Sequence, residues 1–187
     1  MKTERLLLRR FTAADRAPFA AMNADARVMR HFPALLTQAE SDAMVDRIEM
    51  HFLEHGYGLW AAELSSTAEF IGFIGLIVPT WEAAFTPCVE IGWRLRTGHW
   101  GQGLATEGAR AVVQHSFTEL DLRELVSLTV PANRPSRRVM EKLGFARDAA
   151  GDFYHPQLPA GHPLRPHVLY RLRRAEWCAT LKPLPHA

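Results

Sequence analysis

The sequence predicts a mixed α/β fold, and three observations support this fold class. Segments with the periodicity of helices alternate along the chain with segments typical of strands, instead of forming separate blocks. The chain has 187 residues, of which 48% are hydrophobic and 22% are charged, which is enough for one well-buried domain and too few to expect two. No internal repeat is present. We therefore expect a single domain over residues 1–187.

Two capping boxes mark helix starts in the first third of the chain. Thr12 with Asp15, and Thr37 with Glu40, have the spacing at which a hydroxyl and an acidic side chain satisfy free N–H groups of a first helical turn. The sequence therefore predicts helices that begin near residues 13 and 38, the second of which runs to about Gly56.

Two strands are predicted after the second helix. They cover residues 58–63 and 70–78 and are separated by the polar turn 65–69, so we expect an antiparallel hairpin. The apolar run 70–78 is the longest in the chain. It is too short for the roughly 20 residues that a membrane-spanning helix needs, so no membrane partner is expected.

The second half of the chain continues the alternation. Its predicted elements are a strand over 89–96, an amphipathic helix over 102–117, a strand over 124–129, a short helix over 135–143 closed by Gly144, and a final strand pair over 145–153 and 167–172. Four prolines between residues 155 and 166 deny the chain ladder hydrogen bonds, so that segment is expected to be a loop.

Composition excludes several functional classes. The formal net charge is only +2, although 19 of the 22 basic residues are arginines, so no strong field for nucleic acid is expected. The first residues contain no apolar signal segment, and the only cysteines are Cys88 and Cys178. A disulfide framework is therefore unsupported, and a cytoplasmic location is expected. A monomer and a homodimer both remain open.

A glycine-containing turn joins the strand 89–96 to the helix 102–117. Free N–H groups at a helix start carry partial positive charge, and Gly101 and Gly103 would let a phosphate approach them closely. Leu104 and Ala105 stand where a P-loop requires Lys and Ser or Thr, and a third glycine in dinucleotide register is missing. The turn therefore predicts a diphosphate site of another kind, with a plain tight turn as the alternative.

The chain resembles the GNAT acyltransferases, specifically the RimJ/RimL-type branch, which acetylates ribosomal-protein N termini and other amines. The motifs that carry the resemblance cover nearly the whole chain and are Glu4–Arg9, Val28–Arg30, Ile71–Leu76, Val89–Gly108, Pro131–Ser136, Glu141–Phe145 and Tyr170–Trp177. The resemblance implies a twisted, mostly antiparallel sheet of about seven strands, splayed between the fourth and fifth, with four or five flanking helices. It also implies acetyl-CoA (coenzyme A) as co-substrate and direct transfer, in a ternary complex, to a primary amine of a small molecule or a protein N terminus.

By the same resemblance, pantetheine lies in the gap between strand 90–95 and strand 124–130, and the pyrophosphate lies on the glycine turn. Trp100 occupies a position where many GNAT loops carry Arg or Gln, so backbone amides are expected to carry more of the phosphate binding. The residues expected to bind the cofactor are Trp93, Leu95, Arg96, Gly101, Gln102, Gly103, Leu104, Ala105, Thr106, Asn133 and Ser136.

Two residues are expected to be catalytic. Glu90 is the predicted general base, acting through a water, because burial in mid-strand raises a carboxylate's pKa toward the working range; a structural Glu–Arg ion pair is the alternative. Ser136 is the predicted proton or hydrogen-bond donor to the leaving thiolate, since Met140 stands where many GNAT enzymes carry a tyrosine. The alternative for Ser136 is a helix cap.

The acceptor is expected to enter between the early helices and the final hairpin loop. The residues expected to line its path are His31, Phe32, Tyr154, His155, Arg165 and His167. The loop histidines either form a cationic lining suited to an anionic acceptor or are simply solvated. No metal is expected, because their spacing is irregular and no cysteine is near.

Three functional hypotheses follow from the sequence. The first is an acyl-CoA-dependent N-acyltransferase, with acetyl as the expected acyl group. The second is a catalytically inactive CoA-binding regulatory module, and the third is an RNA-associated factor that uses the arginines. Release of free thiol from acetyl-CoA would distinguish the first from the second, and salt-dependent RNA retention would support the third.

Overall fold

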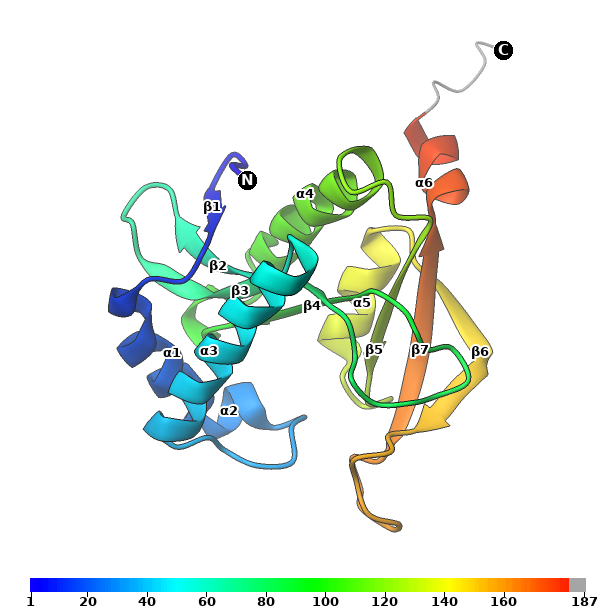
Figure 1. Cartoon of the computed structure of the whole chain (residues 1–187), viewed down its shortest axis with the longest axis horizontal. Helices are drawn as coiled ribbons and strands as arrows, with labels where there is room; N and C mark the ends of the chain where they lie inside the picture. The colour runs from blue at the N-terminus through cyan, green and yellow to red at the C-terminus, as the bar shows by residue number, and fades with distance from the viewer. Residues whose placement is uncertain (182–187) are drawn as a thin grey trace.

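The computed structural model describes residues 1–181, and residues 182–187, the end of the predicted domain, lie outside the described part. Seven strands form one sheet in the order β1-β2-β3-β4-β5-β7-β6 (Figure 1). The strands are β1 (Leu6–Arg9), β2 (Leu59–Leu64), β3 (Phe70–Ile77), β4 (Glu90–Leu95), β5 (Glu124–Thr129), β6 (Ala146–Tyr154) and β7 (Pro166–Arg173). Neighbours are antiparallel except for β4 and β5, which are parallel. The predicted mixed α/β fold is confirmed.

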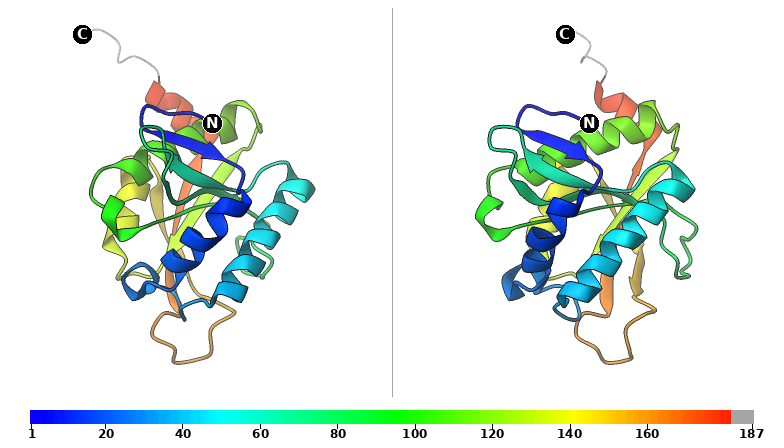
Figure 2. Two further views of the ribbon diagram at one scale, coloured as in Figure 1. Left: turned by 90° about the vertical axis from the view of Figure 1, so that its left-hand side faces the viewer. Right: turned by 60° about the vertical axis from the view of Figure 1, so that its left-hand side comes forward.

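Helices cover both faces of this sheet. Those in residues 1–181 are α1 (Arg16–Asn23), α2 (Ala26–Met29), α3 (Gln38–His55), α4 (Leu104–Thr118), α5 (Arg134–Lys142) and α6 (Arg174–Leu181), with 3-10 turns at Ala13–Asp15 and Thr97–His99. Figure 2 shows α1 and α3 on one face of the sheet and α4 and α5 on the other. The described helices are all too short or too polar to cross a lipid bilayer.

Both capping boxes form. Thr37 donates its N–H to the Glu40 carboxylate at 2.8 Å and receives the Glu40 N–H on its hydroxyl at 3.2 Å, so α3 begins as predicted and ends at Gly56 in a left-handed cap. The box of Thr12 and Asp15 is also present, but it opens a 3-10 turn, and α1 begins only after Asp15.

The structure differs from the prediction in the start of one helix and in the number of helices, which is six in residues 1–181 instead of four or five. The helix predicted from residue 102 begins at Leu104, because Gly101 and Gly103 have φ of +75° and +81°, in the left-handed region. Helix α6 was not predicted, since the closing segment was expected to end with its strand. The hairpins β2–β3 and β6–β7 are antiparallel as predicted.

The core lies between the sheet and its two helical layers. Strand residues such as Leu6, Ile74, Ile91 and Leu125 are fully buried. Gly108 lets α4 sit close to the sheet, because a Cβ at this position would lie 2.4 Å from Cδ1 of Ile74. This contact packs α4 against β3.

Candidate active site

A cavity of about 960 Å³ opens where β4 and β5 diverge. Its wall comes from both strands, the loop after α2, the start of α4, the start of α5 and the loop between β6 and β7. The cavity therefore gathers residues that are as far as 139 positions apart in the chain, from Val28 to His167. Its size is in the range typical of small-molecule sites.

Strand β4 turns alternate main-chain groups to its two neighbours. Arg96 donates its N–H to the Ile71 carbonyl of β3 at 2.8 Å. In an antiparallel ladder every second residue bonds to the same partner. The main-chain groups of Ile91, Trp93 and Leu95 therefore point away from β3, toward β5.

The parallel ladder between β4 and β5 stops after one residue pair. Glu90 lies opposite Val126, and no further pair joins the two strands within residues 1–181. At the next position the Ser127 hydroxyl donates to the Ile91 carbonyl at 3.0 Å, so a side chain replaces the next backbone bond. The main-chain groups of Trp93 consequently face an open gap, and the sheet is splayed between the fourth and fifth strands as the resemblance implied.

The start of α4 presents free amides to the same cavity. The first intrahelical bond runs from the Glu107 N–H to the Gly103 carbonyl, and no side chain caps the helix. The amides of Leu104, Ala105 and Thr106 therefore lack helical partners. No atom lies within 4 Å of the place where a Gly101 Cβ would stand, so the turn is open to a ligand. Its geometry fits a diphosphate.

Two of the predicted cofactor residues do not line this cavity. The Arg96 side chain turns toward β3, where Nη1 donates to the Glu69 carboxylate at 2.6 Å. The Gln102 side chain donates back to the Gly98 carbonyl at 3.0 Å. The Arg96 backbone is likewise bonded to β3, so Arg96 is removed from the proposed cofactor contacts, and for Gln102 only the backbone amide remains.

Trp100 has a structural role that its sequence position did not reveal. Its indole Nε1 donates to the Leu95 carbonyl at 2.7 Å, at the end of β4. Arg30 stacks on the ring, with its guanidinium carbon 5.6 Å from the ring centroid. Trp100 thus closes the edge of β4 beside the glycine turn and leaves the amides of that turn free.

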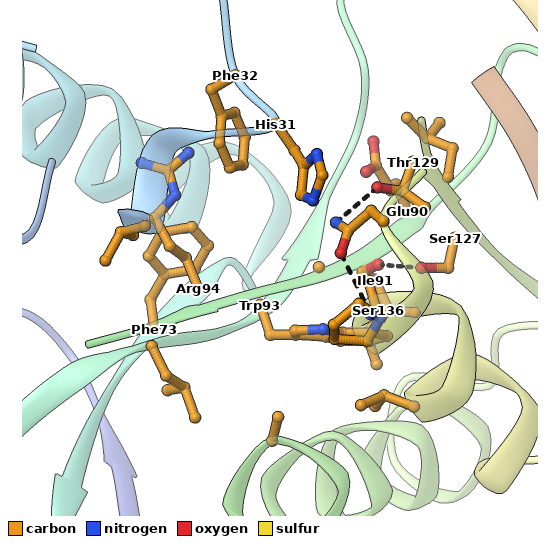
Figure 3. Close-up of a pocket in the computed structure, with 18 of the residues that line it drawn as sticks. His31, Phe32, Phe73, Glu90, Ile91, Trp93, Arg94, Ser127, Thr129 and Ser136 are labelled. Atoms are coloured by element: carbon orange, nitrogen blue, oxygen red, sulfur yellow. Dashed lines mark hydrogen bonds between the residues drawn. The ribbon is translucent and has the colours of Figure 1, made fainter. Parts of the chain in front are cut away.

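Helix α5 contributes two polar side chains. Asn133 caps the helix by accepting the Ser136 N–H at 3.4 Å, and its Nδ2 donates to the Thr129 hydroxyl at 2.9 Å (Figure 3). The cap of α5 is therefore Asn133, which rules out the helix-cap alternative for Ser136. The Ser136 hydroxyl lines the cavity and has no hydrogen bond to a described residue.

Glu90 faces the cavity without a charged partner. It forms no ion pair within the described chain, so the structural Glu–Arg alternative is not realised. Glu90 is half-buried, because part of its surface borders the cavity, and protein atoms enclose the rest of it. Burial raises the pKa of Glu90 to about 8, which keeps the carboxyl group largely protonated at pH 7.

Arg94 lies on the same face of β4 as Glu90. The side chain is 8% exposed, and Nη1 donates to the Asn23 amide oxygen at 2.6 Å. Its guanidinium stacks on Phe32 at 4.0 Å and lies 5.3 Å from the Phe73 centroid. Burial lowers the pKa of Arg94 to about 10, so the group stays charged at pH 7.

The six predicted acceptor residues separate into two groups. His31, Phe32, His155 and His167 line the main cavity. Tyr154 and Arg165 do not. They border a smaller recess in the Pro-rich loop, where the Arg165 guanidinium stacks on the Tyr154 ring at 5.0 Å and Tyr154 is 65% exposed. Both residues are removed from the proposed acceptor site.

Three histidines of the cavity, His31, His155 and His167, have lowered pKa values. Burial lowers the pKa of His155 and His167, and His167, whose ring lies 5.0 Å away, further lowers the pKa of His155. Burial likewise lowers the pKa of His31, whose Nε2 is buried and has no hydrogen-bond partner in residues 1–181. The lowered pKa values contradict a cationic role for the two loop histidines of that lining, His155 and His167.

The comparison with known proteins identifies the family. The model of the acetyltransferase (GNAT) domain matches residues 5–146. The chain belongs to the GNAT acetyltransferase family. Among curated GNAT-like relatives, the uncharacterized N-acetyltransferase YnaD of Bacillus subtilis is 27% identical over 176 residues, which cover 94% of this chain and 97% of YnaD.

Two further similarities support the same family. An FsC-acetyl coenzyme A-N(2)-transacetylase of Aspergillus fumigatus is 35% identical over 132 residues, which cover 68% of this chain and 55% of that protein. The crystal structure of a GNAT-family acetyltransferase from Bacillus anthracis superposes with a TM-score of 0.77 at 26% identity, covering 94% of this chain and 98% of that one.

Arg94, Ser127 and Trp81 are among the cavity residues of this GNAT protein that were not predicted from its sequence. Arg94 stands four residues after Glu90, so strand alternation alone places the two on one face, and this was the signal available. Ser127 looked like an ordinary residue of an apolar strand. Trp81 lies in the loop between β3 and β4, for which no pattern was present. The ring stacks on Phe153 of β6, with centroids 5.6 Å apart.

Proposed function

We propose that this GNAT protein is an N-acetyltransferase that moves the acetyl group of acetyl-CoA to a primary amine by direct attack in a ternary complex. The observation that carries the proposal is the open edge of β4. There the main-chain groups of Trp93 face the gap toward β5, while Glu90 lies on the adjoining cavity wall. One strand thus offers both a binding edge and a base.

The cofactor is a substrate of this reaction, and the residues present suit it. The amides of Leu104, Ala105 and Thr106, with the open turn at Gly101 and Gly103, would hold the pyrophosphate. The gap beside Trp93 would receive the amides of the pantetheine arm as an added strand edge, which ends at Leu95, whose carbonyl already accepts from the Trp100 indole. Bound acetyl-CoA supplies a thioester carbonyl for attack.

The amine must be neutral before it attacks. An α-amine with a pKa of about 8 loses its proton at pH 7 at a free-energy cost of about 1.4 kcal/mol. Ionised Glu90 would accept that proton through a water as nitrogen bonds to the carbonyl carbon. The pKa of about 8 for Glu90 matches the base to such an amine.

The carbon–sulfur bond breaks in the second half of the reaction, and the thiolate leaves. Ser136 is the proposed donor of a hydrogen bond to the departing sulfur, since its hydroxyl lines the cavity and is free of other described partners. A thiol of pKa about 8.5 leaves readily, so a weak donor is sufficient. Asn133 holds the start of α5 and thereby places Ser136.

The proposed acceptors are small-molecule amines and protein N termini, with the RimJ/RimL-type branch as the proposed subgroup. The motif order along the chain supports that branch. The name of the Aspergillus relative specifies acetyl transfer from coenzyme A to nitrogen, which supports the same reaction class here.

The test is acetyl-CoA turnover with a panel of amines and N-terminal peptides, followed by free-thiol release and by mass spectrometry of products. Wild-type protein should acylate at least one member. Glu90→Gln and Ser136→Ala should slow turnover while coenzyme A affinity is kept. The matched controls are Glu4→Gln and Ser66→Ala, at exposed positions outside the cavity. Tight coenzyme A binding without acylation of any acceptor would instead favour the regulatory module.

A further inference from the structure

Arg94 is a buried cation without a counter-charge. Within residues 1–181 it forms no ion pair, and its Nε is buried with no hydrogen-bond partner. Its neutral contacts, the Asn23 oxygen and the rings of Phe32 and Phe73, stabilise the cation only partly. Since a buried charge is strongly unfavourable unless it is paired, this arrangement calls for an anion.

The charge belongs to the acceptor side of the cavity. Residues 90, 92 and 94 share one face of β4, because side chains of a strand alternate. In the view of Figure 3, Arg94 lies on one side of the cavity and Glu90 on the other, with His31 and Phe32 above the space between them. The cofactor amides of the α4 start are elsewhere on the wall.

The face between these two ionisable side chains is open. The residue between them is Gly92, and no atom lies within 4 Å of the place where its Cβ would stand. The Cα atoms of Glu90 and Arg94 are about 13 Å apart along the strand, and both side chains can reach inward. A ligand that spans a few bonds would therefore contact both ends.

We propose that the acceptor is an amine that also carries a carboxylate, with the amine at Glu90 and the carboxylate on the Arg94 guanidinium. The proposal rests on the N-acetyltransferase function proposed above and names its substrate class. Guanidinium donors suit a carboxylate particularly well, and the free Nε supplies one of them. His31 Nε2, the second unpaired polar atom of this wall, is neutral and does not repel the substrate's amine.

The same charge disfavours polyamines. The two ionisable side chains on the Gly92 face of β4 are Arg94, a cation, and Glu90, which is largely protonated at pH 7. A ligand with several ammonium groups would face Arg94 without compensation. An amino acid of suitable length instead places its carboxylate on Arg94 and its amine beside Glu90.

The first experiment compares matched acceptors. Amino acids with the amine on the terminal carbon, from glycine to 5-aminopentanoate, are each assayed beside their carboxamides, with spermidine as the polyamine. In wild-type protein kcat/KM should favour the best carboxylate over its carboxamide by about ten- to hundredfold. Arg94→Gln should bring this ratio close to one, and Arg94→Lys should retain part of it. The control is Arg27→Gln, a surface arginine paired with Asp25, which should leave the ratio unchanged.

The second experiment needs no turnover. Calorimetry with saturating coenzyme A measures binding of the N-acetylated amino acids and their amides. Arg94→Gln should lower the affinity for the carboxylates about ten- to hundredfold and change the affinity for the amides little. If Arg94 had only a structural role, Arg94→Gln would lower the affinity for the carboxylate and for its amide equally. That outcome overturns the proposal.

The two experiments separate the inference from the proposed function. Acylation of amines without any carboxylate preference rejects the role of Arg94 and leaves the transferase intact. Arg94-dependent carboxylate binding without acylation of any acceptor supports the anion site and rejects the transferase. Failure of both measurements in a protein that keeps its circular dichroism spectrum rejects both.

Discussion

Ser127 donates its hydroxyl to the Ile91 carbonyl at the point where β4 and β5 cease to pair. The bond satisfies an acceptor that would otherwise lie buried beside a gap, and it does so without bringing the two backbones together. A side chain that is 2% exposed therefore lets the sheet open while the core stays closed.

Ser127→Ala should destabilise the fold by about 1–3 kcal/mol, because the Ile91 carbonyl loses its partner. It should also weaken coenzyme A binding. Urea unfolding and calorimetry measure the two effects. Ser116→Ala is the matched control: that buried hydroxyl donates to the Val112 carbonyl inside α4, where a backbone bond remains, so the loss should be smaller and cofactor affinity unchanged. Equal effects of the two variants would contradict the role given to Ser127.

Substitution of both turn glycines, Gly101 and Gly103, by alanine should lower the affinity for coenzyme A at least tenfold. Gly101 and Gly103 have positive φ, and a Cβ there adds backbone strain of about 1–2 kcal/mol per residue and crowds the phosphate position. Calorimetric titration with coenzyme A measures the change. Gly161→Ala, at φ of +82° in the Pro-rich loop, carries the same strain outside the cavity. Its affinity should equal that of the wild type, and a loss there would show that strain alone explains the result.

The kcat/KM for the acceptor should rise with pH up to about 8 and then level off, provided that the acceptor amine is fully deprotonated over this pH range. The reason is that burial raises the pKa of Glu90 to about 8, and the base acts only in its ionised form, which is present above that pH. Glu90→Gln should lose this limb and fall about 10²- to 10⁴-fold at pH 8.5. A pH–rate profile measures both. An unchanged profile in the variant would assign the titration to the amine itself.

Gly92→Ala should leave stability nearly unchanged and lower acceptor turnover. A Cβ at residue 92 meets no protein atom within 4 Å, so the fold has room for it, but it projects onto the face between Glu90 and Arg94. We expect a higher KM for the acceptor and an unchanged Kd for coenzyme A. Thermal unfolding, steady-state kinetics and calorimetry distinguish these quantities. A large drop in Tm would instead assign Gly92 to the packing of the sheet.

Local signals in the sequence were sufficient for most of the fold. The capping box at Thr37, the glycine at residue 56 and the alternating strands each act over a few residues, so their outcome depends little on the rest of the chain. Helix α6 escaped prediction because its start directly continues the strand β7. The same continuity hides a helix wherever no turn residue separates the two elements.

Contacts across the fold limited the prediction of the site. The turn at Gly101 could be recognised because its function is carried by its own backbone. Arg94 could not, since its missing counter-charge becomes visible only when α1, the loop after α2 and β3 surround it. Tyr154 and Arg165 were misplaced for the related reason that the Pro-rich loop turns part of its side chains outward.

The sheet has two halves, one of strands β1 to β4 and the other of β5 to β7, and a single backbone bridge between Glu90 and Val126 joins them. A ligand that forms hydrogen bonds along the open edge of β4 would add a second connection between the two halves. Cofactor loading is then expected to stiffen the whole sheet. Amide hydrogen exchange should slow on strands that the ligand never touches.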